Sequence, residues 1–268
     1  MPEPAVLRRF SASATRYDAH AHAQRLSARD LLAFTRRLLP EGFGPGRRVL
    51  EPGCGTGLYT RMLLDAFPGA AIAGVDFSEA MVRVARGRIR DPRVRFEVAD
   101  AEEIVSGTYD LVTSNATFQW FLSFPRTVAR MASLVGPDGL LTFSFFGPGT
   151  YAELDEALME AAGEGGAPSG TRVAATGFLG RDEIAAVLSS AFNRWDVVER
   201  RYHQEYPSLS DLLRSIRYTG TRGNGAPWGV TPRRLARVEE AYRKRHGGIR
   251  ATYQVLLCRG QAAGGGAG

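Results

Sequence analysis

Apolar and polar positions along this chain of 268 residues follow two alternating patterns. Short apolar runs of strand length are separated by longer segments whose apolar side chains recur every three or four residues. The strand-like runs span residues 47–51, 71–76, 94–99, 109–115 and 139–146. Helical spacing is found at 58–67, after Ser78, at 151–162 and 182–192, and through Phe124, Val128, Met131 and Val135. Regular alternation of strand and helix predicts a doubly wound α/β fold with a mostly parallel sheet, because crossover helices return the chain to the same end of each strand.

Both ends of the chain depart from this alternation. Residues 1–40 are predicted to be helical, with Ser27 and Asp30 as an N-terminal cap pair. Later segments at 195–206 and 251–259 have strand patterns, with helical pieces between them. We therefore expect a seven-stranded sheet with an antiparallel edge strand, N-terminal helices and a C-terminal helical cap insertion. The expected divisions are an N-terminal helical segment at 1–40, a cofactor-binding α/β core at 41–206, a cap insertion at 207–250, and a last strand with a loose tail at 251–268.

The run from Glu51 to Gly57, Glu-Pro-Gly-Cys-Gly-Thr-Gly, connects the first predicted strand to a helix. Doubly wound sheets bind ligands at such a place, where glycines let a ligand approach the main chain and the helix offers free N–H groups. The dinucleotide fingerprint needs Gly or Ala at position 58, where Leu58 stands, and no Gly-Lys-Ser/Thr of a P-loop follows. The spacing instead resembles motif I of class I methyltransferases, which bind S-adenosylmethionine. By that resemblance Glu51, Gly53 and Gly55 are expected to bind the cofactor.

Two acidic residues end the next two predicted strands. Asp76, followed by Phe77, ends the second strand, where a carboxylate can accept both ribose hydroxyls. NAD-binding proteins place an acid similarly, so Asp76 alone does not identify the cofactor. Asp100 ends the third strand, where it can accept the adenine amino hydrogens while the Ala101 N–H faces a ring nitrogen. Because the glycine loop, Asp76 and Asp100 follow three successive strands, we interpret them as one site for S-adenosylmethionine rather than as unrelated helix-capping and turn residues.

Composition and charge limit the classes of binding partner and the cellular location, but they do not identify the substrate. The formal net charge is +6, and Lys244 is the only lysine. An arginine-rich surface suits nucleic acid, an acidic protein or a carboxylate substrate, or is simply solvated. No apolar run is long enough to span a bilayer, and residues 1–10 lack the apolar stretch of a signal peptide, so we expect a cytoplasmic protein. Cys54 and Cys258 have no metal-ligand spacing, so neither a metal site nor a disulfide framework is expected.

A closer family resemblance extends from about residue 10 to residue 258. Its pieces are Phe10-Ser11, Tyr17-Asp18, Gln24, Ser114-Asn115-Ala116, Gln119-Trp120, Phe-Phe-Gly-Pro-Gly-Thr at 145–150, Tyr206-Pro207-Ser208 and Thr-Tyr-Gln-Val-Leu at 252–256. In these pieces the chain resembles the malonyl-acyl-carrier-protein O-methyltransferases of biotin synthesis. It departs from them in a longer, Gly- and Trp-rich segment from Gly220 to Val230, and in Arg217, where a lysine is expected.

The resemblance implies methyl transfer from S-adenosylmethionine to the free carboxylate of a malonyl group on acyl-carrier protein or coenzyme A. The resulting methyl ester would serve biotin synthesis. A carboxylate is already ionised at neutral pH, so we expect alignment and exclusion of water rather than a general base. Tyr17, Trp120 and Arg217 are the expected catalytic residues, with Arg217 pairing the substrate carboxylate. Tyr17, Gln24 and Asn115 are expected to join the cofactor-binding set.

Other functions stay open at this point. They are a small-molecule carboxyl or carbon methyltransferase of the same fold, a nucleic-acid methyltransferase or RNA-binding module, and a catalytically silent fold that keeps the cofactor site. Nucleic-acid binding is disfavoured because the arginines are not interleaved with aromatic residues in one contiguous motif. We expect a monomer that binds neither nucleic acid nor a membrane.

Overall fold

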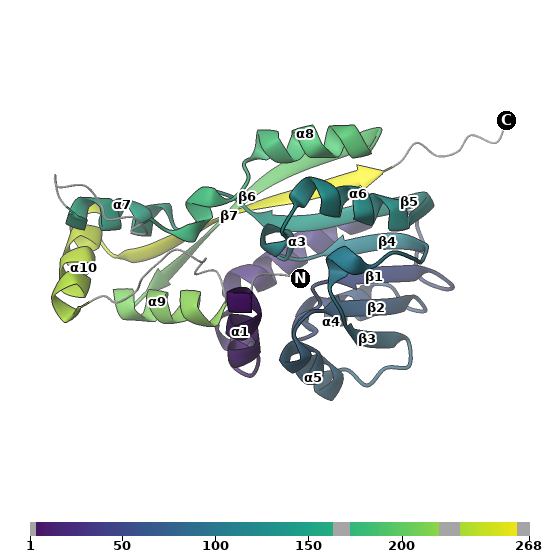
Figure 1. Ribbon diagram of the computed structural model, residues 1–268, viewed down its shortest axis with the longest axis horizontal. Coiled ribbons are helices and arrows are strands. Elements are labelled where there is room, and N and C mark those ends of the chain that lie inside the picture. Colours follow the sequence, from purple (N-terminus) through teal and green to yellow (C-terminus); the bar gives the residue numbers. More distant parts are fainter. Residues whose placement is uncertain (1–3, 163–171, 220–230, 262–268) are drawn as a thin grey trace.

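The computed structural model describes residues 4–162, 172–219 and 231–261. Within these ranges the chain forms a seven-stranded sheet in the order β3-β2-β1-β4-β5-β7-β6 (Figure 1). Strands β1 to β5 pair in parallel, whereas β7 runs antiparallel to both of its neighbours, β5 and β6. The predicted fold class, with its mostly parallel sheet and antiparallel edge pair, is confirmed. The strands are β1 (Arg48–Pro52), β2 (Ala71–Asp76), β3 (Val94–Val98), β4 (Tyr109–Ser114), β5 (Val135–Phe146), β6 (Arg194–Tyr206) and β7 (Ile249–Gln261).

Helices occupy the connections between strands and the N-terminal segment. They are α1 (Pro4–Ser13), α2 (Tyr17–His20), α3 (His22–Arg36), α4 (Leu58–Ala66), α5 (Glu79–Arg88), α6 (Phe124–Leu134), α7 (Ala152–Ala162), α8 (Arg181–Ala191), α9 (Leu209–Tyr218) and α10 (Pro232–His246), with short 3₁₀ turns η1 (Ala101–Glu103), η2 (Phe118–Trp120) and η3 (Ala174–Gly177). Two local predictions are wrong: Ser27 and Asp30 lie inside α3 rather than at a helix start, and Val135 begins β5 rather than ending a helix. None of the helices in the described ranges is both long and apolar enough to cross a membrane.

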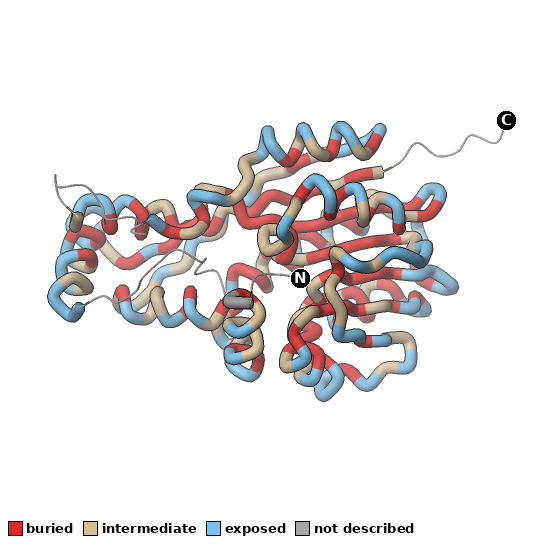
Figure 2. The backbone as a smooth tube through the Cα atoms, viewed as in Figure 1, coloured by how far each residue is buried: buried red, intermediate tan, exposed pale blue. Residues whose placement is uncertain are grey.

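Two hydrophobic cores lie on opposite faces of the sheet. Successive side chains of a strand point to opposite faces: Val49 and Leu111 belong to one core, and their neighbours Leu50 and Val112 belong to the other. Helices α3, α4 and α5 cover the first face, and α6 and α8 cover the second. Figure 2 shows the resulting band of buried residues along the central strands. Burial on both faces explains why these strands are nearly continuous apolar runs.

A second region projects from one end of the sheet. β5 ends its pairing with β7 at Phe146 and Val255, while β7 continues back to Ile249, paired with β6 throughout. This two-stranded extension carries α7, α9 and α10 (Figure 1). We call the extension and these three helices together the cap lobe. Helix α7 precedes residue 207, so the cap lobe draws on a segment assigned from sequence to the core. The predicted domain limits stay predictions, and Gly220 to Val230 lies outside the described residues.

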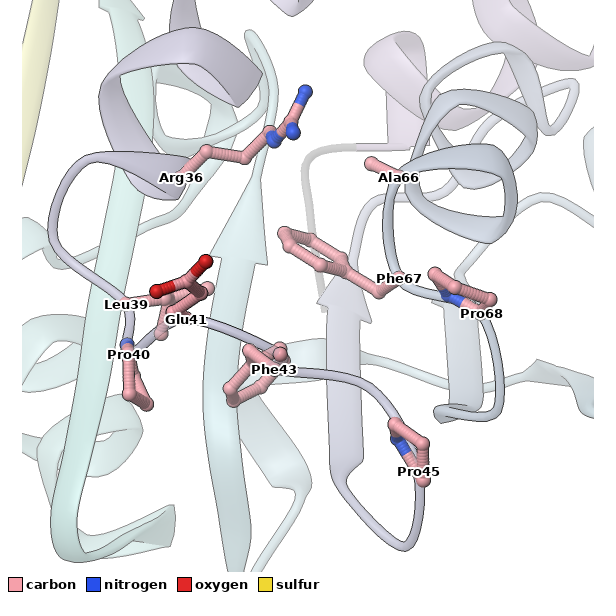
Figure 3. Close-up of a pocket in the computed structure, with 10 residues that line it drawn as sticks. Arg36, Leu39, Pro40, Glu41, Phe43, Pro45, Ala66, Phe67 and Pro68 are labelled. Atoms are coloured by element: carbon pink, nitrogen blue, oxygen red, sulfur yellow. The ribbon is translucent and has the colours of Figure 1, made fainter.

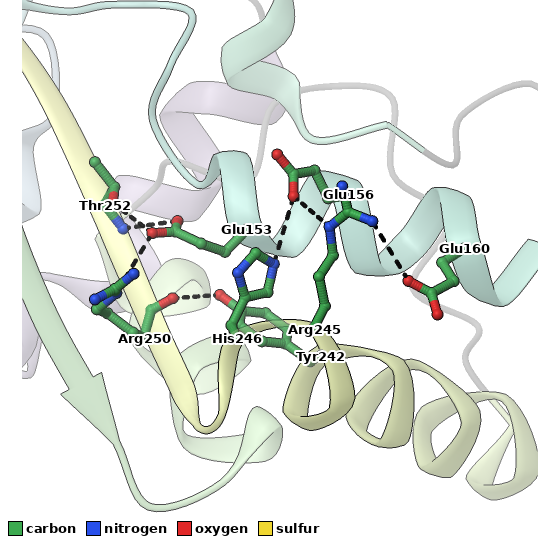
Figure 4. A network of polar contacts seen from close by, with 8 residues as sticks. All are labelled: Glu153, Glu156, Glu160, Tyr242, Arg245, His246, Arg250 and Thr252. Carbon is green, nitrogen blue, oxygen red and sulfur yellow. Dashed lines mark hydrogen bonds and ion pairs between the residues drawn. The ribbon is translucent and has the colours of Figure 1, made fainter.

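Polar contacts fasten α7 to the strand and helix that follow it in the cap lobe (Figure 4). The buried Glu153 carboxylate accepts hydrogen bonds from the main-chain N–H of Thr252, at 3.0 Å, and from its hydroxyl. Arg245 of α10 pairs with Glu156 of α7 at 2.7 Å. Because these bonds join elements nearly a hundred residues apart in sequence, they hold the cap lobe in one arrangement.

The glycine-rich turn at 147–150 is built around Gln254 of β7. The Gln254 side-chain oxygen accepts a bond from Gly149 N at 2.7 Å, and its main-chain oxygen accepts one from Gly147 N at 2.9 Å. A Cβ at Gly147 would lie 2.6 Å from the Gln254 side-chain oxygen, so a larger residue there would displace the Gln254 side chain from its bond to Gly149 N. The turn delivers Tyr151, which is buried and adopts a left-handed conformation with φ 62°.

Candidate functional site

The glycine loop lies at the carboxyl edge of the parallel strands, between β1 and α4. Gly53 N and Cys54 N both donate to Val75 O, at 2.7 and 3.0 Å, which fastens the loop to β2. Gly55 has φ 53°, and a Cβ built on it would meet nothing within 4 Å. The loop therefore presents bare main chain to open space at Gly55, as a closely bound ligand requires.

Asp76 lies beside this loop, as predicted. Its two carboxylate oxygens accept bonds from Gly55 N at 2.9 Å and Ser78 N at 2.8 Å. Burial raises the pKa of Asp76 from 3.8 to about 6, although both hydrogen bonds act in the opposite direction. The carboxylate thus joins the glycine loop to the start of α5 at the carboxyl end of β2.

Asp100 and Ala101 occupy the next strand end. Asp100 caps η1, and its Oδ1 accepts a bond from Glu102 N at 3.0 Å, while Ala101 is buried. Glu102 accepts further bonds from Thr127 Oγ1 at 2.8 Å and Leu122 N at 3.1 Å. These bonds fix η1 against the segment after η2, so the ends of β3 and β4 are held together.

Asn115 and Gln24 meet at the end of β4. Asn115 Oδ1 accepts bonds from Ser27 at 2.8 Å and Ser144 at 2.9 Å, and its Nδ2 donates to Gln24 O at 3.1 Å. Ala116, the next residue, has φ 53°. Asn115 therefore ties α3 and β5 to the turn that leads to η2, and its polar atoms are directed at protein partners.

Glu51 lies behind the glycine loop. It is 1% exposed and accepts a hydrogen bond from Thr60 Oγ1 of α4 at 2.6 Å. Burial, with a smaller contribution from the Asp76 charge, raises the pKa of Glu51 from 4.5 to about 8. Its carboxyl group is therefore protonated in much of the folded protein at neutral pH.

The N-terminal helices bring three of the predicted residues together through Phe10. The Phe10 ring of α1 lies 6.2 Å from Tyr17, 6.1 Å from Phe77 and 5.8 Å from Trp120, measured between ring centroids. Trp120 also meets Phe178 edge-on at 5.9 Å. Sequence reasoning used Phe10 only for the family resemblance, because its helical spacing carries no sign of what its ring contacts.

Tyr17 begins α2 and is half-buried beside the glycine loop. Burial raises the pKa of its hydroxyl well above the usual range, and the nearby charges of Asp18 and Asp76 act in the same direction. The hydroxyl is therefore neutral at physiological pH and able to donate a hydrogen bond. This arrangement brings the predicted Tyr17 next to the predicted Asp76.

Arg217 is not joined to this cluster. It is exposed in the last turn of α9 and makes no hydrogen bond or ion pair with another residue of the described ranges. Its neighbour Tyr218 contacts α2, stacking on His20 with ring centroids 4.7 Å apart and accepting a bond from Arg16 at 2.8 Å. The end of α9 thus lies against the N-terminal helices, with the Arg217 side chain exposed.

A separate hollow of about 680 Å³ opens between the end of α3 and the end of α4 (Figure 3). Phe43, Phe67 and Pro68 line it, with Arg36 and Glu41 as its charged residues. The hollow precedes the start of β1 at Arg48, whereas the glycine loop follows the end of that strand. It therefore lies at the opposite edge of the sheet from the site described above.

Comparisons with known proteins agree with this arrangement. A family model described as a methyltransferase domain matches residues 49–139. The YcgJ protein from Bacillus subtilis has a TM-score of 0.59 at 17% identity, covering 88% of this chain and 100% of that chain. Haemonchus contortus phosphoethanolamine N-methyltransferase 2, in complex with S-adenosyl-L-methionine, has a TM-score of 0.54 at 18% identity, covering 88% and 53%. Fold and glycine loop together define a methyltransferase of the class I fold.

Full-length relatives give the family. Malonyl-[acyl-carrier protein] O-methyltransferases from Geobacter sulfurreducens and Halalkalibacterium halodurans are 36% and 32% identical, covering 92% and 95% of this chain and 94% and 97% of theirs. The chain belongs to the malonyl-[acyl-carrier protein] O-methyltransferase family. A Paenibacillus member is 34% identical over 96% of this chain and 98% of its own length.

Proposed function

We propose that this protein transfers a methyl group from S-adenosylmethionine to the free carboxylate of malonyl-acyl-carrier protein, giving a methyl ester for biotin synthesis. The similarity that carries this proposal extends over more than nine-tenths of the chain and includes the cap lobe as well as the cofactor-binding half. Malonyl-coenzyme A is the alternative methyl acceptor to test. We further propose that the protein acts as a monomer in the cytoplasm.

The carboxyl edge of the sheet fits the proposed cofactor. Gly55 leaves space beside the main chain, which suits the close approach of the methionine part. Asp76 and Asp100 end adjacent strands, and carboxylates at these positions suit ribose hydroxyls and the adenine amino group. Gly53, Phe77 and Ala101 are the other residues at this edge that we propose to contact the cofactor. When bound, the sulfonium group supplies an electrophilic methyl.

The protein's own contribution is alignment and exclusion of water. The malonyl carboxylate is ionised at neutral pH and needs no general base. The Tyr17 hydroxyl, neutral at physiological pH, can donate a hydrogen bond that orients one of the reactants. Phe10 and Trp120 place apolar surface over the site, which keeps water from the nucleophile. Glu51 and Asn115 hold the loop and helix α3 in place through side-chain hydrogen bonds to the protein, and Gln24 takes part through its main-chain oxygen.

Arg217 is the proposed partner of the malonyl carboxylate. It is exposed and lacks an acidic partner in the described ranges, and Tyr218 beside it contacts the N-terminal helices near Tyr17. A charge-assisted hydrogen bond of about 1.5–3 kcal/mol would make its removal cost about tenfold or more in substrate affinity.

The test is methyl transfer from labelled S-adenosylmethionine to malonyl-acyl-carrier protein, malonyl-coenzyme A, free malonate and bulk RNA. We expect label on the malonyl thioester, with Arg217→Ala raising the KM for that substrate while the affinity for S-adenosylhomocysteine stays constant. Arg95→Ala, which removes an exposed arginine on edge strand β3, is the control. Label on RNA alone, or on free malonate alone, would reject the proposed substrate.

A further inference from the structure

Asp18, which stands out in the sequence only as part of the family resemblance, joins three elements around the glycine loop. One carboxylate oxygen accepts a hydrogen bond from Thr56 Oγ1 at 2.7 Å, and the other pairs with Arg88 at the end of α5. Thr56 stands between Gly55 and Gly57 and is buried. The Asp18 side chain therefore connects α2 directly to the loop that presents bare main chain.

The main chain of Asp18 is held as well. Arg25 of α3 donates to Asp18 O at 2.6 Å. Arg88 is itself held through its main-chain oxygen, which accepts a bond from Arg61 of α4 at 2.9 Å. Helices α3, α4 and α5 thus fix the position of Asp18, directly or through Arg88, and they fix Tyr17 next to it.

A second attachment lies one helix earlier. Ser11 Oγ of α1 lies 2.9 Å from Ser78 Oγ, which caps α5, and the Phe10 ring meets Phe77. These contacts of α1 and α2 with the loop and with α5 are made through side chains. Side-chain contacts can break while the helices themselves stay intact, so residues 4–20 can detach from the loop without unfolding.

We propose that Asp18 is a positioning residue that closes residues 4–20 over the cofactor and limits the rate at which the cofactor leaves. This inference rests on the proposed function, because it needs a cofactor between the glycine loop and α2. When Asp18 releases Thr56 and Arg88, Tyr17 and Phe10 move away from the site together. Breaking a charge-assisted hydrogen bond and a partly exposed ion pair corresponds to about tenfold weaker binding.

The experiment compares Asp18→Ala and Asp18→Asn with Asp110→Ala, a matched control. Like Asp18, Asp110 accepts one hydrogen bond and pairs with one arginine, but its donors are the Arg48 main-chain N–H and Arg47, at 2.8 and 2.7 Å, and it lies at the opposite edge of the sheet. S-adenosylhomocysteine affinity is measured by calorimetry, its release rate by stopped-flow tryptophan fluorescence, and the mobility of residues 4–20 by hydrogen exchange.

We expect Asp18→Ala to weaken S-adenosylhomocysteine binding about tenfold, mainly through faster release, and to speed exchange over residues 4–20. Asp18→Asn keeps an acceptor for Thr56 and should give a smaller loss, as should Thr56→Val, so the test stands even where the alanine variant does not fold. The KM for S-adenosylmethionine should rise while the KM for the malonyl substrate does not.

Two outcomes would overturn the inference. If the affinity and release rate of the Asp18 variants equal those of the wild type, Asp18 does not hold the site closed, although the proposed function survives. If Asp110→Ala weakens binding equally, the effect is general destabilisation. A wild-type protein that binds no S-adenosylhomocysteine would instead reject the proposed function and this inference with it.

Discussion

Replacing Glu51 by glutamine should change how the stability of the cofactor-free protein depends on pH. The Glu51 carboxyl is buried behind the glycine loop and bonded to Thr60, with the Asp76 carboxylate as its charged neighbour. Burial raises its pKa from 4.5 to about 8, so the folded protein holds a proton that the unfolded chain releases. The stabilisation from Glu51 is therefore fully present below about pH 4.5 and is lost as the pH rises through about 8.

The size of the effect follows from linkage between protonation and folding. With a pKa of 4.5 in the unfolded chain and about 8 in the folded protein, Glu51 alone lowers the free energy of unfolding by about 3–4 kcal/mol between pH 5 and pH 8. Asp76 contributes with the same sign, from 3.8 to about 6, and because it titrates in both proteins most of its contribution drops out of the comparison. Glutamine keeps an oxygen for Thr60 and cannot titrate.

Urea unfolding at several pH values between 5 and 8, without cofactor, measures the difference. We expect the free energy of unfolding of Glu51→Gln to fall by about 3–4 kcal/mol less than that of the wild type over this range. Glu97→Gln, at an exposed glutamate on edge strand β3, should follow the wild-type curve. Parallel curves for the wild type and Glu51→Gln would refute the argument, because Glu51 would then be ionised in both states.

Three other substitutions test separate parts of the structure. Gly55→Ala adds a methyl group at φ 53° where the ligand approaches, so S-adenosylhomocysteine affinity by calorimetry should fall about tenfold. Tyr17→Phe removes a neutral donor and should reduce kcat/KM in the methyl-transfer assay severalfold, at about 0.5–1.5 kcal/mol, without lowering Tm. Gly149→Ala brings a Cβ to 2.9 Å from Gln254, so the free energy of unfolding in urea should fall by about 1–3 kcal/mol. If one of these substitutions leaves the measured value unchanged, the role assigned to that residue is wrong.

The sheet and its carboxyl edge were predictable because their signals are local. The central strands β1, β4 and β5 are buried on both faces over most of their length, so their apolar runs are nearly continuous, and each crossover helix has its own period. Once the strands are parallel, the residues that follow them must meet at one edge. The positions of Gly55 and Asp76 follow from that reasoning, and their hydrogen bond agrees with it. The prediction for Val135 was wrong because this residue lies at the junction of α6 and β5, where an apolar side chain fits the helical period and the strand pattern equally well.

The arrangement of the N-terminal helices could not be predicted in the same way. A helical period states that α1 and α3 are helices and which face is apolar, but not which distant surface that face covers. The contacts of Phe10 with Phe77 and Trp120 span 67 to 110 residues. The Asp18 carboxylate likewise reaches Thr56 and Arg88, which lie in other elements. Such contacts depend on tertiary packing, of which a single sequence carries no periodic trace.

The direction of a side chain also could not be predicted from the position of its residue at the end of a strand. Glu51 and Asp76 both end parallel strands, yet Asp76 lies beside open space at Gly55 while Glu51 is turned inward to Thr60. Asn115 ends a third strand and is bonded to α3 and β5. The position of a residue at the edge therefore predicts that it supports the cofactor site. Direct contact depends on whether its side chain lies beside open space, as that of Asp76 does, or is turned into the protein, as those of Glu51 and Asn115 are. Substitutions of Glu51 and Asn115 should accordingly change stability before they change affinity for the cofactor, whereas substitutions of Asp76 should change affinity first.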